Sequence, residues 1–129
     1  MLRKSLDGLR KRLLRSMAEK IKKGDFLLNL YVERIAEEFP LSTVILFGSR
    51  ARGDPLPYSD YDIAVIFDVV EDKLSLIEKL RRMKPKGLPL DLLVLSLEEI
   101  FDPLIRGMFK DSRILYDGLG VKEKLKVTT

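Results

Sequence analysis

The sequence of 129 residues predicts a two-layer α+β domain in which helices flank a small β-sheet. Segments with apolar residues at every third or fourth position alternate with short apolar runs rich in valine and isoleucine. The first pattern is typical of amphipathic helices and the second of buried strands. A composition of 46% hydrophobic and 34% charged residues suits one domain. We expect it to span residues 1–129, with a helical extension at 1–39, a core at 41–117 and a polar tail at 118–129.

The first element is a predicted amphipathic helix over residues 2–23. Apolar residues recur in it at steps of three and four, at Leu2, Leu6, Leu9, Leu13, Met17 and Ile21. Gly24 is expected to end this helix, and Asp25 to cap a second one, because these residue types favour those positions. The second helix runs to about Phe39 and ends before Pro40, because a proline disfavours helix at the residue before it.

The core follows as alternating strands and short helices. The first predicted elements are a strand at 41–47, a short helix at 49–53, a loop at 54–57 and a strand at 61–67. A helix at 74–83 and a strand at 89–95 follow. The last elements are a helix capped by Ser96 and Glu99 and broken at Pro103, and an edge strand at 113–116. The strand at 41–47 is apolar on both faces at its end, so it is expected at the centre of the sheet.

The composition excludes several kinds of chemistry. There are no cysteines and no histidines, which removes disulfides, thiolate metal sites, cysteine nucleophiles, histidine acid–base catalysis and most zinc sites. A bound metal must therefore have oxygen ligands, which favours Mg²⁺ or Mn²⁺. No apolar run approaches the length of a membrane span, and the first residues lack the apolar segment of a secretory signal, so we expect a cytoplasmic protein with no membrane contact.

The positive charge is concentrated near the N-terminus. Residues 1–23 hold nine Lys or Arg and two Asp or Glu, whereas the rest of the chain holds 15 and 18. One interpretation is a contact with nucleic acid or a membrane surface. We favour a solvated helix face, because no aromatic or base-reading pattern accompanies the charge. A third interpretation is that the leucines dock a partner subunit or a second copy of the chain.

A Gly-Ser pair follows the predicted strand at 41–47. Gly48 lets the backbone approach phosphate oxygens closely, and Ser49 offers a hydroxyl donor at the start of a helix, where free N–H groups attract anions. Taken alone, such a pair is an ordinary turn.

Three carboxylates accompany this turn. Asp60 and Asp62 open the next strand, and because they are two residues apart they point to the same side. Asp91 lies in an apolar run that predicts burial, where an ionised carboxylate is costly unless it is paired or binds a metal. A neighbouring strand would bring Asp91 beside the other two, and three carboxylates could then hold two Mg²⁺ ions. Each acid alone could be a strand cap or an edge residue, but the combination indicates a metal-dependent nucleotide site.

These residues resemble the DNA polymerase beta nucleotidyltransferase superfamily. The shared pattern is Gly48-Ser49, ten further residues and Asp60-x-Asp62, with Asp91 as the third acid. The variant here is similar to that of the minimal nucleotidyltransferases, and it reads Phe47-Gly48-Ser49-Arg50-Ala51-Arg52-Gly53, then Ser59-Asp60-Tyr61-Asp62. The resemblance covers about residues 41–117 and implies a mixed sheet flanked by helices.

The resemblance also implies an activity and roles for the residues. The implied reaction is Mg²⁺-dependent transfer of a nucleoside monophosphate from an NTP, with Gly48 and Ser49 binding the triphosphate. Asp60, Asp62 and Asp91 would bind the metals, and Asp91 would also deprotonate or orient the acceptor hydroxyl. Two further residues, Arg50 and Arg52, match the family's basic pair, either as phosphate or acceptor contacts or as solvated surface arginines.

Minimal nucleotidyltransferases often act beside a helical partner of the HEPN type, as antitoxin to its toxin. The resemblance therefore implies transfer of AMP from ATP to a tyrosine hydroxyl of such a partner. The alternatives are transfer to a small molecule or to an RNA end, and a binding-only antitoxin with an inactive site. The first two functions usually require a further domain, which this short sequence does not predict.

Overall fold

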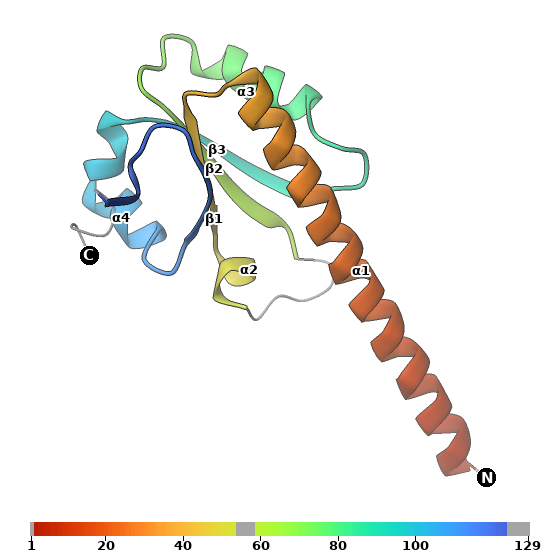
Figure 1. Ribbon diagram of the computed structural model, residues 1–129. Coiled ribbons are helices and arrows are strands. Elements are labelled where there is room, and N and C mark those ends of the chain that lie inside the picture. Colours follow the sequence, from red (N-terminus) through yellow and green to blue (C-terminus); the bar gives the residue numbers. More distant parts are fainter. Residues whose placement is uncertain (1, 54–58, 124–129) are drawn as a thin grey trace.

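A computed structural model describes residues 2–53 and 59–123, with side chains from residue 7 onward. Its centre is a four-stranded sheet in the order β3-β2-β1-β4 (Figure 1). The strands are β1 Ser42–Phe47, β2 Tyr61–Phe67, β3 Leu90–Ser96 and β4 Arg113–Asp117. β1 runs antiparallel to β2 and β4, whereas β2 and β3 are parallel. The mixed sheet, the central position of β1 and the edge position of β4 are all as predicted.

Helices cover both faces of this sheet. They are α1 Leu2–Glu38, α2 Ser49–Arg52, α3 Lys73–Arg82, the 3₁₀ helix η1 Glu98–Phe101 and α4 Pro103–Met108. The predicted break at Pro103 is confirmed, since Asp102 caps α4 through the backbone N–H of Leu104, at 2.8 Å. The expected loop at 54–57 lies outside the described residues. Within the described residues, no helix has both the length and the apolarity needed to cross a membrane.

Alternate residues of β2 face two different apolar clusters. The first lies under α1 and α3 and includes Leu28, Tyr31, Ile35, Val44, Leu46, Tyr61, Ile63, Val65 and Leu80. The second lies on the opposite face under η1 and α4 and includes Ile45, Ala64, Ile66, Leu95, Ile100, Phe109 and Val121. Because side chains alternate along a strand, neighbouring residues of β2 belong to different clusters. The side chain of Asp62 therefore lies on the face opposite to α1.

The predicted break between two N-terminal helices is wrong, because α1 runs without interruption through Gly24 and Asp25. Gly24 is instead a contact point with β2. A side chain there would place its Cβ 2.5 Å from the hydroxyl oxygen of Tyr61. The same hydroxyl donates a hydrogen bond of 2.7 Å to Asp25. Gly24 and Asp25, which suggest a helix end in the sequence, therefore allow α1 to pack closely against β2.

The boundary of the expected polar tail at residue 118 is also wrong. Val121 is buried in the second cluster, and Leu119 packs against it. The carboxylate of Asp117 holds this segment, since it accepts hydrogen bonds from the backbone N–H groups of Val121 and Lys122 and from the Thr43 hydroxyl, at 2.9, 3.0 and 2.9 Å. The packed core therefore extends beyond β4.

Candidate active site

The three predicted acids lie at one end of the strands, where β2 and β3 begin and β1 ends. In the strand register, Asp62 is opposite Phe47 of β1 and opposite Asp91 of β3. Paired residues of neighbouring strands point to the same face, so Asp62 and Asp91 lie side by side. Asp60 directly precedes β2 and is exposed. The predicted proximity of Asp91 to the Asp60 and Asp62 pair is thus present in the fold.

Asp91 is exposed, which corrects the expectation that it is buried. The apolar run around it suggested a central strand, but β3 is an edge strand and Asp91 is its second residue. The Asp91 carboxylate is therefore open to solvent, and burial does not require that it be paired.

The electrostatics of the site centre on Asp62. Its pKa is raised, first by burial, then by the negative charges of Asp91 and Asp60 and by a hydrogen bond with Asp91. The positive charge of Arg52 opposes the shift. A carboxylate whose pKa is raised by neighbouring negative charges marks a place where a divalent cation would relieve repulsion.

The residues present fit such a cation by their donor chemistry, because carboxylate oxygens suit Mg²⁺ and Mn²⁺. They are not a preassembled cage. Across residues 7–53 and 59–123, no group of three His, Cys, Asp or Glu side chains has the arrangement of a metal site.

Gly48 is required at its position for two reasons. Its φ of 75° lies in the left-handed region that glycine tolerates best. In addition, a Cβ at Gly48 would overlap the Oδ2 atom of Asp62. The carbonyl of Gly48 accepts hydrogen bonds from the N–H groups of Ala51 and Arg52, both at 3.2 Å, which begins α2. The turn that carries Ser49 is thereby laid directly against the central carboxylate.

Arg50 and Arg52 differ although they share the four-residue helix α2. Arg50 is only 7% exposed, so the solvated interpretation is wrong for it. Its Nε and Nη2 atoms donate to the carbonyl of Ser59 at 2.9 and 2.6 Å, and its guanidinium lies 3.9 Å over the ring of Tyr61. Arg52 is exposed, and its charge acts on Asp62.

Tyr61, which lies between the two acids of β2, is a residue that the sequence did not single out. It is 1% exposed and sits under Arg50, with its hydroxyl on Asp25 of α1. Burial and then Asp25 raise the pKa of this hydroxyl, against the effect of Arg50. The available signal was its position, because an aromatic residue between two strand acids must face the opposite side.

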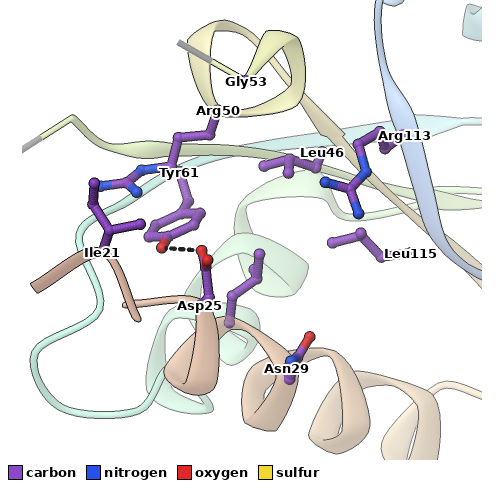
Figure 2. Close-up of a pocket in the computed structure, with 10 residues that line it drawn as sticks. Ile21, Asp25, Asn29, Leu46, Arg50, Gly53, Tyr61, Arg113 and Leu115 are labelled. Atoms are coloured by element: carbon purple, nitrogen blue, oxygen red, sulfur yellow. Dashed lines mark hydrogen bonds between the residues drawn. The ribbon is translucent and has the colours of Figure 1, made fainter. Parts of the chain in front are cut away.

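A cavity of about 590 Å³ opens on the α1 face of the sheet, and Figure 2 shows its lining. Asp25 and Asn29 contribute from α1, and Arg113 and Leu115 from β4, with Tyr61 at one end. The side chains of Asp62 and Asp91 face the opposite side of the sheet, so this cavity is not the site of the carboxylates.

A turn at the end of a strand, laid against paired carboxylates on the next two strands, is an arrangement suited to nucleotidyl transfer. The nucleotidyltransferase domain family matches residues 28–116. The chain therefore belongs to the nucleotidyltransferase domain family, which agrees with its predicted resemblance to the minimal nucleotidyltransferases. A comparison with curated proteins found no match.

Several solved structures share the fold. A putative nucleotidyltransferase from Sulfolobus solfataricus is 30% identical, with a TM-score of 0.61 over 84% of this chain and 90% of that one. A toxin–antitoxin structure with AMP-PNP is 22% identical, with a TM-score of 0.59 over 78% and 81%. A mutant form of the toxin–antitoxin MntA-HpeT is 19% identical, with a TM-score of 0.53 over 74% of each chain.

Proposed function

We propose that this nucleotidyltransferase transfers AMP from ATP to a tyrosine hydroxyl of a HEPN-type helical partner in the cytoplasm, and so acts as an antitoxin. The observation that carries the proposal is the contact of the Gly48 turn with the Asp62 carboxylate, beside Asp91. This contact would bring a triphosphate on the turn within reach of metal-binding oxygens.

In the proposed reaction, Gly48 and Ser49 hold the triphosphate, and Arg52 supplies positive charge beside it. The acceptor oxygen attacks the α-phosphorus, so that a new O–P bond forms as the bond to the leaving pyrophosphate breaks. Asp91 takes or orients the proton of the acceptor hydroxyl. Asp60, Asp62 and Asp91 would hold two Mg²⁺ ions, which when bound neutralise charge on the attacking and leaving oxygens.

Three observations support ATP as the donor and a protein as the acceptor. One neighbour of the same fold is a toxin–antitoxin structure with AMP-PNP, an analogue of ATP. A second is likewise a toxin–antitoxin structure. The exposed position of Asp91 also leaves the acceptor side of the carboxylates open to a large molecule.

The test is to incubate the protein with the purified product of the adjacent gene, Mg²⁺ and ATP labelled at the α-phosphate. We expect label on the adjacent protein, and none when the label is on the γ-phosphate, because that phosphate leaves with pyrophosphate. A stable complex without any transferred label would contradict the reaction and favour a binding-only antitoxin. Label on a small molecule or an RNA end would contradict the protein acceptor.

A further inference from the structure

The two halves of α1 have different surroundings. The residues of its second half that face the sheet are buried, among them Leu28, Tyr31 and Ile35. The first half projects beyond the rest of the domain, as Figure 1 shows. In this projecting half, residues 7–23, the side chains of Leu9 and Leu13 are 56% and 62% exposed. No described part of the chain covers them.

The exposed leucines continue the buried face of the same helix. Leu9, Leu13 and Met17 are spaced by four residues, and Gly24 and Tyr31 follow at steps of seven. Steps of four and seven keep residues on one side of an α-helix. The face that packs on the sheet therefore extends past its edge as an apolar stripe without a partner.

The stripe runs toward the end of the sheet where β2 and β3 begin. The projecting half ends next to Gly24, which contacts Tyr61, the residue between Asp60 and Asp62. A hollow of about 220 Å³ lies at this junction and is lined by Lys20, Lys23, Gly24, Leu27, Arg50, Gly87 and Pro89. Pro89 accepts a hydrogen bond of 2.9 Å from the Tyr61 N–H and stands two residues before Asp91. A molecule seated on the stripe would thus lie at the end of the sheet where β2 and β3 begin. Its acceptor hydroxyl would reach the carboxylates around this end, where Asp60 and Asp91 are exposed, because Asp62 and Asp91 face the side opposite to α1.

The charge of this surface indicates what would bind it. The projecting half carries seven Lys or Arg and two Asp or Glu. A second copy packed on the same face would bring like charges together, which opposes association. A helix with an apolar stripe bordered by Asp and Glu would cover the leucines and pair with the lysines.

We propose that the projecting half of α1 docks the acceptor protein through an acidic amphipathic helix and so presents its hydroxyl to Asp60, Asp62 and Asp91. The proposal rests on the proposed function for the identity of the acceptor. The leucines supply affinity, and the lysines at the hollow select an acidic partner.

The experiment measures binding of the purified adjacent-gene protein by isothermal titration, together with AMP transfer. The stripe variant combines Leu9→Glu with Leu13→Glu, and the hollow variant combines Lys20→Glu with Lys23→Glu. The control combines Leu74→Glu with Leu104→Glu, two leucines that are each 74% exposed elsewhere on the surface. We expect binding to weaken at least about 30-fold in the stripe variant and about 10-fold in the hollow variant. The control should match the unaltered protein, and binding of a fluorescent ATP analogue should stay unchanged in all three variants.

The outcomes separate the docking surface from the reaction. If the stripe variant loses binding but the unaltered protein transfers no AMP, the docking proposal holds and the proposed function fails. Equal binding by the stripe and control variants overturns the docking proposal, as does the absence of any binding by the unaltered protein. It is also overturned if the stripe variant instead dissociates a homodimer in light scattering, or loses only the binding of a 20-nucleotide single-stranded RNA on filters.

Discussion

The two faces of β2 differ sharply at neighbouring residues. On the α1 face, Tyr61 is buried, stacked under Arg50 and hydrogen-bonded to Asp25. On the opposite face, Asp62 lies among like charges that raise its pKa, and Asp91 beside it is exposed. One face is fixed by packing and the other carries electrostatic repulsion. A strand can therefore keep mutually repelling carboxylates in place because its other side is held by a rigid contact.

The largest effect is expected on the face of β2 that carries Asp62. Asp60→Ala together with Asp62→Ala should lower AMP transfer by at least about 10³-fold, because the site would lose ligands for the metals. The free energy of unfolding should stay the same or rise slightly, since the substitutions relieve repulsion at a partly buried site. Label transfer and urea unfolding measure the two quantities. Transfer by the double variant would show that the carboxylates have been assigned wrongly.

The next largest effect is expected at the Gly48 turn, which lies against the Asp62 carboxylate. Gly48→Ala should destabilise the fold by roughly 2 kcal/mol or more and reduce transfer strongly, because a Cβ at a φ of 75° would also meet the Asp62 carboxylate. Gly53→Ala is a matched control. Its φ is 82°, but an added Cβ has no atom within 4 Å. It should cost only about 1 kcal/mol and leave the affinity for ATP intact. Equal losses in both variants would mean that backbone strain alone explains Gly48.

The α1 face of β2 is tested by comparing Tyr61 with Tyr31, a second buried tyrosine that donates a hydrogen bond. Tyr61→Phe removes the hydrogen bond to Asp25, and Tyr31→Phe removes one of equal length, 2.7 Å, to the carbonyl of Leu80. Each should lower the free energy of unfolding by about 1 kcal/mol. Only Tyr61→Phe should also reduce kcat of transfer, by about 3-fold to 10-fold with little change in KM. The same kcat in both variants would mean that the Tyr61 hydrogen bond does not help to position the carboxylates.

The fold was largely predictable because its signals are local. Strand runs, the Gly48 turn and the break at Pro103 each depend on neighbouring residues, and the structure confirms them. The role of Gly24 was not predictable, because its reason is the Tyr61 hydroxyl on a strand far along the chain. The exposure of Asp91 depends on the place of β3 at the sheet edge, and the burial of Arg50 on the ring beneath it. Tertiary contacts decided all three.

The smallest effect is expected at the far end of the sheet. Burial raises the pKa of Asp117, but its hydrogen bonds with the Val121 N–H, the Thr43 hydroxyl and the Lys122 N–H outweigh burial, so the pKa is lowered. A lowered pKa stabilises the fold above the ordinary value for aspartate, and this stability is lost as the pH falls through the folded-state pKa. Asp117→Asn should therefore cost about 1 kcal/mol at pH 7 and progressively less as the pH falls through the folded-state pKa of Asp117. A difference in urea unfolding that does not shrink as the pH falls through this range would exclude the charge as its cause.

The hydrogen bonds of the tyrosines bear on self-modification. An enzyme that adds AMP to tyrosine hydroxyls risks labelling its own. In the described part of the chain, Tyr31, Tyr61 and Tyr116 each donate their hydroxyl hydrogen internally, to Leu80, Asp25 and Pro40, at 2.7, 2.7 and 2.6 Å. Tyr61, which directly precedes Asp62, also faces away from the Asp62 carboxylate, because neighbouring strand residues point to opposite faces. Under the proposed activity, these three side chains are poor acceptors of AMP and compete little with the hydroxyl of the target.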